Sequence, residues 1–433
     1  MKNFGRFLFV SFFVINLIII FTGWLGYSQP LLSGSGTDWL LALSRITGLL
    51  AVYFILWQLW LVSRLKLLEK FISFDQSLVW HHWFGLLTGL FILAHPILAT
   101  LAYAINSQNS ILGQLKSFFL YWEEMIPAGI SLILFIVAVI ISIQLIKKKL
   151  NYEFWYFVHL TFYAAILLAF GHQLEVGGDF LAQPWFRIYW IILYTIMIGV
   201  FVLYRFIQPV WLWQKHRFTV EKIIQESTNT WSIFLTGQNL SNFPIQAGQF
   251  VIIRFLTKRF FLEAHPFSIS AVPDGKSLRI TYKELGNHTK KLKDLKPGTK
   301  IIIDGPHGAM TTDSIKSNKI IMIAGGIGVT PLRALAEKLS QEQKNVEFFY
   351  IAKEECDFVF ENELALLKNI NLHLFCSIKK ERLTAEQIIQ TVPDWSKCDI
   401  FICGPTGLYQ QLSKNFKTLG LPKKQLHFEK FNF

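Results

Sequence analysis

Four histidines stand in two strongly apolar segments, where their residue type and spacing could bind metal cofactors. His81 or His82 precedes His95 in one segment. In the other segment His159 precedes His172. A titratable side chain in a membrane helix is costly, so it normally faces the bundle interior and serves a ligand or a pathway. At about 1.5 Å rise per residue, such partners lie roughly 20 Å apart inside a hydrocarbon core about 30 Å thick. The pattern predicts two stacked haems, one near each leaflet, and hydrogen-bonded core histidines are the alternative.

Helix rotation distinguishes between the two neighbouring histidines. At about 100° per residue, a step of 14 residues ends about 40° from its start, whereas a step of 13 ends about 140° away. His81 is therefore a better partner for His95 than His82 is. The step from His159 to His172 is the awkward one, so we expect a π-bulge or another helix distortion near Gly171.

Two glycine turns in the second half of the chain are typical of nucleotide binding. The apolar run KIIMIA leads into GGIGVTP and then into the helix-like LRALAEKL, and a CGP turn follows the apolar run DIFI. Glycines at a strand-to-helix turn let the backbone approach a pyrophosphate, and ligands bind beyond the carboxyl ends of parallel strands. Plain tight turns are the alternative, with Cys403 as a small buried residue. The residues of the two turns are Gly325, Gly326, Gly328, Thr330, Pro331, Cys403, Gly404 and Pro405.

Two further motifs could hold a flavin nucleotide. The HPFS motif combines an aromatic ring with a hydroxyl, which could stack on a flavin ring and hydrogen-bond to it. The GNHT motif leads into the basic run KKLKDL and offers an anion-binding helix start. Taken alone, the first is an ordinary strand and the second a solvated lysine face. Their residues are His265, Pro266, Phe267, Ser268, Gly286, Asn287, His288 and Thr289.

Apolar stretches in the first half must position the four histidines. With 52% hydrophobic residues and a mean hydropathy of +0.38, the 433-residue chain is too apolar to be wholly soluble. Windows of about 20 residues predict six spans. These lie near 7–28, 38–62, 80–103, 124–146, 153–174 and 186–208.

Lysine and arginine flank alternate ends of these spans. Basic clusters lie near residues 2–6, 64–70, 147–149 and 215–217, and the opposite connections are almost free of them. The positive-inside rule places these clusters and the N-terminus in the cytoplasm of a multi-pass protein of the plasma or inner membrane. The net charge of +13 then reflects topology and attraction to the lipid bilayer, and we expect no nucleic-acid partner.

The second half reads as two soluble domains. After Pro209 short alternating runs predict an antiparallel β-barrel, and from about residue 318 buried strands alternate with helices, as in a doubly wound α/β domain. The expected domains are 1–212, 213–312 and 313–433. All four cysteines lie in this half without a close pair, which fits a reducing cytosol and disfavours disulfides or a zinc site.

These motifs and their order resemble the ferric reductase and NADPH oxidase superfamily over essentially the whole chain. The family's HxxxG is matched by His81 to Gly85, and Phe154-Trp155-Tyr156 leads to the second histidine pair. The resemblance implies a six-helix haem domain with two b-type haems, an FAD-binding β-barrel and an NADPH-binding domain. It also implies that Arg45 lies beside the outer haem. A terminal aromatic residue, here Phe433, would cover the flavin where nicotinamide enters. Phe433, Cys403 of the CGP motif and Arg45 are the expected catalytic residues.

The resemblance implies electron flow from cytosolic NAD(P)H through FAD and both haems to an external acceptor. Dioxygen, giving superoxide, is the first expectation, and a ferric chelate is the second. An electron-donating membrane protein that serves an external protein is a third, so a protein partner is neither required nor excluded. A transporter bundle fused to a reductase is the remaining alternative. Lys353, Lys379, Lys380 and Arg382 favour NADPH, whereas nearby Glu354, Glu355 and Asp357 leave NADH open.

Overall fold

The computed structural model describes residues 2–69, 71–143, 150, 152–379 and 383–430. Its contacts divide the chain into two compact units, each of which is described by itself. The first comprises Met1–Ile72 and Gln76–Arg205, and the second Ser73–Asp75 and Phe206–Phe433.

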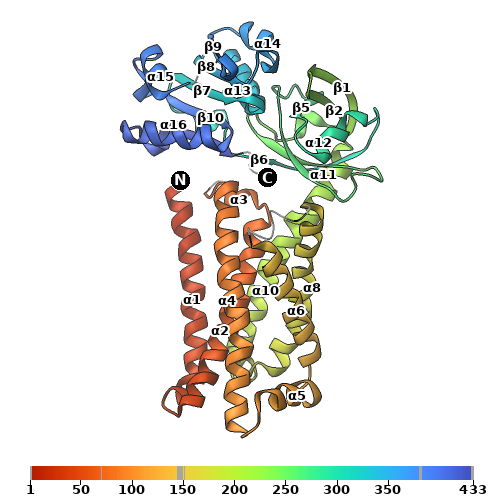
Figure 1. The fold of residues 1–433 in the computed structure, drawn as a ribbon, viewed down its shortest axis with the longest axis vertical. Helices are drawn as coiled ribbons and strands as arrows, with labels where there is room; N and C mark the ends of the chain where they lie inside the picture. Colours follow the sequence, from red (N-terminus) through yellow and green to blue (C-terminus); the bar gives the residue numbers. More distant parts are fainter. Residues whose placement is uncertain (1, 70, 144–149, 151, 380–382, 431–433) are drawn as a thin grey trace. The chain divides into compact units, whose positions relative to one another are not determined.

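The first unit is a helical bundle (Figure 1). Within the described ranges, six helices are long and apolar enough to cross a membrane, as the sequence predicted. These candidate spans are Phe4–Leu32, Gly36–Val62, Gln76–Asn106, Met125–Ser142, Phe154–Val176 and Pro184–His216. The helices are α1 (Lys2–Leu32), α2 (Gly36–Val62), α3 (Lys66–Glu69), α4 (Phe74–Asn106), α5 (Ile111–Tyr121), α6 (Met125–Ser142), α8 (Tyr152–Val176), α9 (Gly178–Ala182) and α10 (Pro184–Val202), whereas α11 (Gln208–His216) belongs to the second unit.

Aromatic packing and a few internal hydrogen bonds hold the bundle together. Trp57 is fully buried, and its ring meets Phe9 edge-on at 4.9 Å and Phe13 at 5.3 Å between centroids. Gln58 Nε2 donates to Thr88 Oγ1 at 2.8 Å between α2 and α4. Because lipid offers no hydrogen-bond partners, such polar groups must satisfy each other inside the bundle.

The expectation of a helix distortion near Gly171 is wrong. Helix α8 is regular α-helix from Tyr152 to Val176, and a π-helical turn lies instead at Leu203–Ile207. Both α8 histidines nevertheless face a histidine of α4 without a break in the helix. Helix α5 is an element that the span pattern did not predict.

The barrel part of the second unit has six antiparallel strands in two sheets, β1-β2-β5 and β4-β3-β6. Bridges from Thr219 to Lys300 and from Ile269 to Ile280 join the sheets, so their inner faces share one apolar core. The strands are β1 (Thr219–Ser227), β2 (Thr230–Thr236), β3 (Phe250–Phe255), β4 (His265–Ser268), β5 (Ser277–Lys283) and β6 (Ile301–His307).

The α/β part has one parallel sheet in the order β11-β10-β7-β8-β9. The strand order reverses between β7 and β10, and such a switch point opens a crevice for ligands at the carboxyl ends. The strands are β7 (Lys319–Gly325), β8 (Asn345–Ala352), β9 (Ile370–Cys376), β10 (Asp399–Gly404) and β11 (Leu426–Lys430). The helices are α13 (Val329–Gln341), α14 (Glu361–Ala365), α15 (Ala385–Thr391) and α16 (Thr406–Thr418).

Candidate functional site

Helices α4 and α8 bring the four histidines together as two facing pairs. The ring centroids of His81 and His159 lie 6.1 Å apart, and those of His95 and His172 lie 6.4 Å apart. A metal–imidazole bond is about 2 Å long, so two rings on opposite sides of one ion have centres about 6 Å apart. Both pairs fit bis-histidine haem ligation. His82 is exposed, and its ring contacts Trp83 instead.

Hydrogen bonds orient individual rings of these pairs. The Nδ1 of His95 lies 2.7 Å from the Ser44 carbonyl oxygen, and Ser142 Oγ lies 3.0 Å from Nδ1 of His159. A partner on Nδ1 leaves Nε2 as the ligand atom. Gly48 makes the first contact possible, because a Cβ at that position would lie 2.9 Å from His95 Nδ1. The sequence motifs did not point to Ser44, Gly48 or Ser142.

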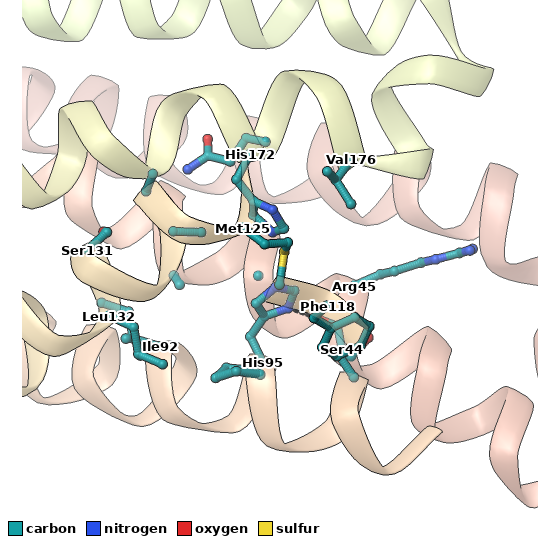
Figure 2. Close-up of a pocket in the computed structure, with 18 of the residues that line it drawn as sticks. Ser44, Arg45, Ile92, His95, Phe118, Met125, Ser131, Leu132, His172 and Val176 are labelled. Carbon is teal, nitrogen blue, oxygen red and sulfur yellow. Dashed lines mark hydrogen bonds between the residues drawn. The ribbon is translucent and has the colours of Figure 1, made fainter. Parts of the chain in front are cut away.

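A cavity of about 420 Å³ surrounds the His95–His172 pair, which is a typical size for a cofactor or ligand site. Figure 2 shows the two rings pointing toward each other, with Arg45 extending away from both. Arg45 also lines the cavity, and its guanidinium carbon lies 4.4 Å from the centroid of the Tyr27 ring. Arg45, the arginine that we expected beside the outer haem, therefore lies at the edge of the cavity around His95 and His172.

Asp179 is a cavity residue that the motifs did not reveal. It lies in α9 between two candidate spans and is 5% exposed. Its Oδ1 has no hydrogen-bond partner among the residues described. Burial raises the pKa of the Asp179 carboxyl to about 6, although Arg45 acts to lower it. A carboxyl whose pKa is raised to about 6 and an arginine therefore line the same cavity.

The HPFS motif forms β4 of the barrel. Phe267 is buried and packs against Phe255 and Tyr282, with centroid distances of 6.5 and 6.3 Å. The adjacent Ser268 hydroxyl is buried and has no hydrogen-bond partner within the described part of the chain. A buried hydroxyl normally has a hydrogen-bond partner, so the Ser268 hydroxyl fits a site in which a bound flavin would supply that partner.

The GNHT motif lies beside β4. His265 and His288 have ring centroids 3.8 Å apart, and Glu263 contacts both of them. One ligand atom from each of the three lies within 4.8 Å of the others. Thr289 Oγ1 accepts hydrogen bonds from the Leu285 and Gly286 amides, so the two amides that precede α12 (Asn287–Lys291) are already used. The HPFS and GNHT motifs are therefore in contact through His265 and His288. Glu263, which the sequence motifs did not indicate, contacts both histidines.

The two glycine turns meet at the switch point of the parallel sheet. A Cβ on Gly328 would lie 2.3 Å from the Cys403 carbonyl oxygen. A Cβ on Gly404 would lie 2.9 Å from the Gly325 Cα. Cys403 is fully buried, and Thr330 Oγ1 donates to the Ile327 carbonyl at 3.0 Å. The glycines therefore let the two turns pack backbone against backbone at the carboxyl ends of β7 and β10.

The charged residues that bear on nucleotide choice are largely paired with each other. Lys353 Nζ lies 3.9 Å from a Glu354 carboxylate oxygen, and Lys379 pairs with Glu355. Each of these two ammonium groups already has a carboxylate partner, so neither is available only for binding a 2′-phosphate. Lys380, Arg382 and the terminal Phe433 lie outside the described residues.

Comparison with known families accounts for all three parts of the chain. Residues 47–170 match the family described as ferric reductase like transmembrane component. Residues 222–311 match an FAD-binding domain, and residues 322–414 match an oxidoreductase NAD-binding domain. The chain belongs to the ferric reductase and NADPH oxidase superfamily. This superfamily member therefore combines a multi-pass membrane domain with FAD- and NAD(P)-binding domains.

Relatives of this superfamily member differ in their named activities. Ferric reduction oxidase 7 of Arabidopsis thaliana is 23% identical, covering 75% of this chain and 44% of that protein. A superoxide-generating NADPH oxidase heavy chain of Dictyostelium discoideum is 27% identical, covering 58% of this chain and 40% of that protein. Flavohemoprotein A of Dictyostelium discoideum is 26% identical, covering 51% of this chain and 61% of that protein. The chain thus spans less than two thirds of the length of each.

Solved structures resemble the dehydrogenase half of this superfamily member. The flavohem-like FAD/NAD binding domain of nitric oxide dioxygenase from Vibrio cholerae is 21% identical, with a TM-score of 0.43. That likeness covers 50% of this chain and 99% of the solved chain.

Proposed function

We propose that this protein is a transmembrane NAD(P)H oxidase that reduces extracytoplasmic dioxygen to superoxide. The observation that carries the proposal is the presence of two facing histidine pairs, 6.1 and 6.4 Å apart, in a chain with FAD- and NAD-binding domains. His81 with His159 would hold an inner b-type haem, and His95 with His172 an outer one. NADPH is the expected donor, with NADH possible.

The protein's own contribution is binding, orientation and electrostatics. When bound, FAD converts a two-electron hydride into single electrons, and haem carries single electrons. His95 and His172 would both be used to hold one haem, so the acceptor would be reduced without binding the metal. Arg45 lines the same cavity and supplies positive charge, which would favour the charge that develops on dioxygen.

A ferric chelate is the second candidate acceptor. The observation in its favour is that the likeness to ferric reduction oxidase 7 covers 75% of this chain, against 58% for the superoxide-generating relative. A periplasmic or surface protein as obligate acceptor is the third candidate, and the same histidine pairs would serve it.

We further propose the domain limits 1–212, 213–312 and 313–433 and a location in the plasma or inner membrane. The N-terminus and both dehydrogenase domains would face the cytoplasm. The alternating distribution of basic residues along the chain supports this orientation.

Turnover of the purified, haem- and FAD-loaded protein tests the function. With only NADPH or NADH added in air, we expect probe reduction that superoxide dismutase abolishes. A parallel anaerobic assay measures ferric-chelate reduction. A good anaerobic rate with no superoxide in air would favour the ferric reductase function, and no turnover with either acceptor would favour an obligate protein partner.

A further inference from the structure

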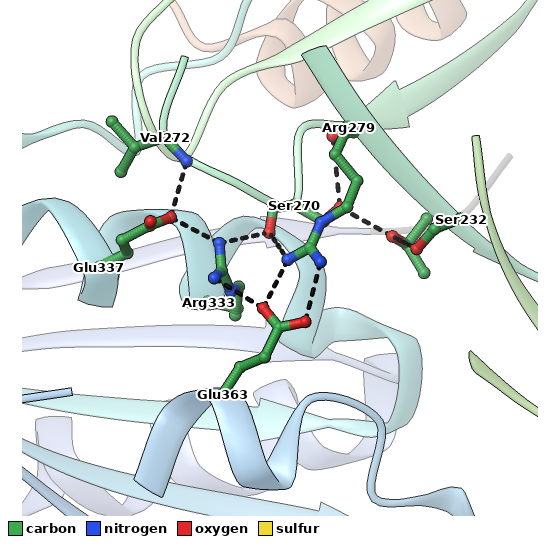
Figure 3. Close-up of polar contacts among 8 residues, drawn as sticks. Ser232, Ser270, Val272, Arg279, Arg333, Glu337 and Glu363 are labelled. Atoms are coloured by element: carbon green, nitrogen blue, oxygen red, sulfur yellow. Dashed lines mark hydrogen bonds and ion pairs between the residues drawn. The ribbon is translucent and has the colours of Figure 1, made fainter. Parts of the chain in front are cut away.

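Two buried arginines in the second unit share one glutamate. Arg279 on β5 is 9% exposed and Arg333 on α13 is 7% exposed. Arg279 binds Glu363 of α14 in a fork, with Nη1–Oε1 at 2.9 Å and Nη2–Oε2 at 2.8 Å. Arg333 Nη2 reaches the same Oε2 at 2.6 Å. Figure 3 shows both guanidinium groups converging on this carboxylate.

A second set of contacts ties this cluster to the backbone. The Ser270 carbonyl accepts from Arg279 Nη2 at 2.9 Å and from Arg333 Nη1 at 3.0 Å. Glu337 Oε2 accepts from Arg333 Nη1 at 2.5 Å and from the Val272 amide at 2.9 Å. The two arginine charges are thus balanced by two carboxylates, as buried charges require.

The cluster joins the flavin-binding side of the unit to the nucleotide-binding side. Ser270 and Arg279 belong to the barrel, whereas Arg333 and Glu363 belong to the α/β part. Ser270 follows Ser268 of the flavin motif by two residues, and Arg333 follows Pro331 of the GGIGVTP turn by two. Both ends of the cluster therefore lie next to a cofactor motif.

We infer that Arg279, Arg333 and Glu363 are positioning residues that hold the GGIGVTP turn at one fixed place relative to the flavin motif. The inference rests on the proposed function, because hydride transfer is the step that requires the GGIGVTP turn and the flavin motif to keep a fixed relative position. Hydride transfer would break the C4–H bond of the dihydronicotinamide and form an N–H bond on the flavin ring, which would take up both electrons. The reacting atoms must approach to about 3–3.5 Å, and a displacement of about 1 Å can cost roughly 100-fold in rate.

Ion pairing suits this task because domains within one chain otherwise move relative to each other. A forked arginine–carboxylate pair fixes direction as well as distance. Removing the charge of Glu363 would leave two buried guanidinium groups with Glu337, the partner of Arg333, as their remaining counter-charge in this cluster. Such an uncompensated buried charge is strongly destabilising.

Stopped-flow reduction of bound FAD tests the inference in the full-length protein. The variants are Glu363→Gln, which removes the charge, and Arg279→Lys, which keeps the charge but removes the fork. The matched control is Asp394→Asn, which breaks the 2.9 Å ion pair with Lys319 inside the α/β part. Rates are measured anaerobically at saturating NADPH and at saturating NADH, are divided by the FAD content, and are repeated with C4-deuterated nucleotide.

We expect both cluster variants to reduce FAD at least about tenfold more slowly. The slowed phase should keep a primary isotope effect, nucleotide affinity should change little, and Asp394→Asn should behave as the unmodified protein. A purely structural role would lower FAD content or melting temperature while the rate per bound FAD stayed unchanged, and that result would overturn the inference.

The same experiment separates this inference from the proposed function. If neither nucleotide reduces the flavin of the unmodified protein, the proposed function fails. If the unmodified protein is reduced and the variants match it, only the positioning role fails. Should Glu363→Gln lose its FAD, Arg279→Lys decides the question, because it retains the balance of charge.

Discussion

Gly328 lies directly against the backbone of Cys403, so closely that a Cβ on Gly328 would be 2.3 Å from the Cys403 carbonyl oxygen. Gly328 belongs to the turn after β7, and Cys403 lies at the carboxyl end of β10, the neighbouring strand of the parallel sheet. This contact brings the two expected nucleotide motifs to one place at the sheet's switch point. It also explains why the position needs a glycine, since no side chain fits there.

Gly328→Ala should therefore impair nucleotide use. The added methyl must push the turn away from β10, which displaces the GGIGVTP turn and the start of α13 that follows it. We expect a clear loss of NADPH affinity and slower flavin reduction, measured by titration and stopped flow. Gly407→Ala is the matched control, because a Cβ there meets nothing within 4 Å. Equal behaviour of the two variants would contradict this role.

Replacing His95 or His172 by Ala should remove one of two haems. Each variant loses one histidine of the His95–His172 pair, whereas the His81–His159 pair is left intact. The haem content per chain, measured as the pyridine complex, should fall from two to one. His82→Ala is the neighbouring control and should keep both, because His82 is exposed. A single haem in the unmodified protein would refute the two-haem proposal.

Arg45→Ala should slow electron delivery to oxygen more than it slows flavin reduction. Arg45 lines the cavity around His95 and His172 and belongs to the first unit, whereas the FAD- and NAD-binding domains belong to the second. The check is to compare re-oxidation of the reduced protein by air with anaerobic flavin reduction. Lys116→Ala, an exposed cation on α5, serves as the control. Equal slowing of both steps would argue against a local role for Arg45.

Phe433→Ala tests the proposal that the terminal aromatic residue limits access of nicotinamide to the flavin. Phe433 lies outside the described residues, so this prediction depends on the family resemblance alone. We expect a changed rate of flavin reduction or a changed preference between NADPH and NADH, measured by stopped flow. No change in either quantity would exclude the role.

The contribution of Glu363 to stability should be insensitive to pH near neutrality. Burial acts to raise the pKa of Glu363, but the hydrogen bond from Arg279 and the charges of Arg333 and Arg279 hold it below its usual value. A lowered folded-state pKa means that the stabilisation is complete above the unfolded value of about 4.3 and is lost as the pH falls through the folded value.

The melting temperature measures this directly. The difference in Tm between the unmodified protein and Glu363→Gln should stay constant from pH 8 to about pH 5.5 and should shrink only below about pH 4. A difference that already disappears between pH 7 and pH 6 would point to a histidine as the controlling group instead.

Local patterns in the sequence were enough to predict the architecture. Apolar windows of membrane length predicted six spans, and short alternating runs followed by buried strands predicted the barrel and the parallel sheet. These signals are local because hydropathy and side-chain alternation repeat within a single element. The glycine turns were also recognisable, since a strand, a glycine run and a helix are contiguous in the chain.

Only the tertiary structure decided which side chains meet. Rotation about an ideal helix favoured His81 over His82 but wrongly required a distortion near Gly171, because helix crossing and side-chain direction are not properties of one helix. Arg279 and Glu363 are 84 residues apart and look like ordinary surface charges in the sequence. Burial turns them into an ion pair, because a charge removed from water must find its partner wherever the fold has placed it.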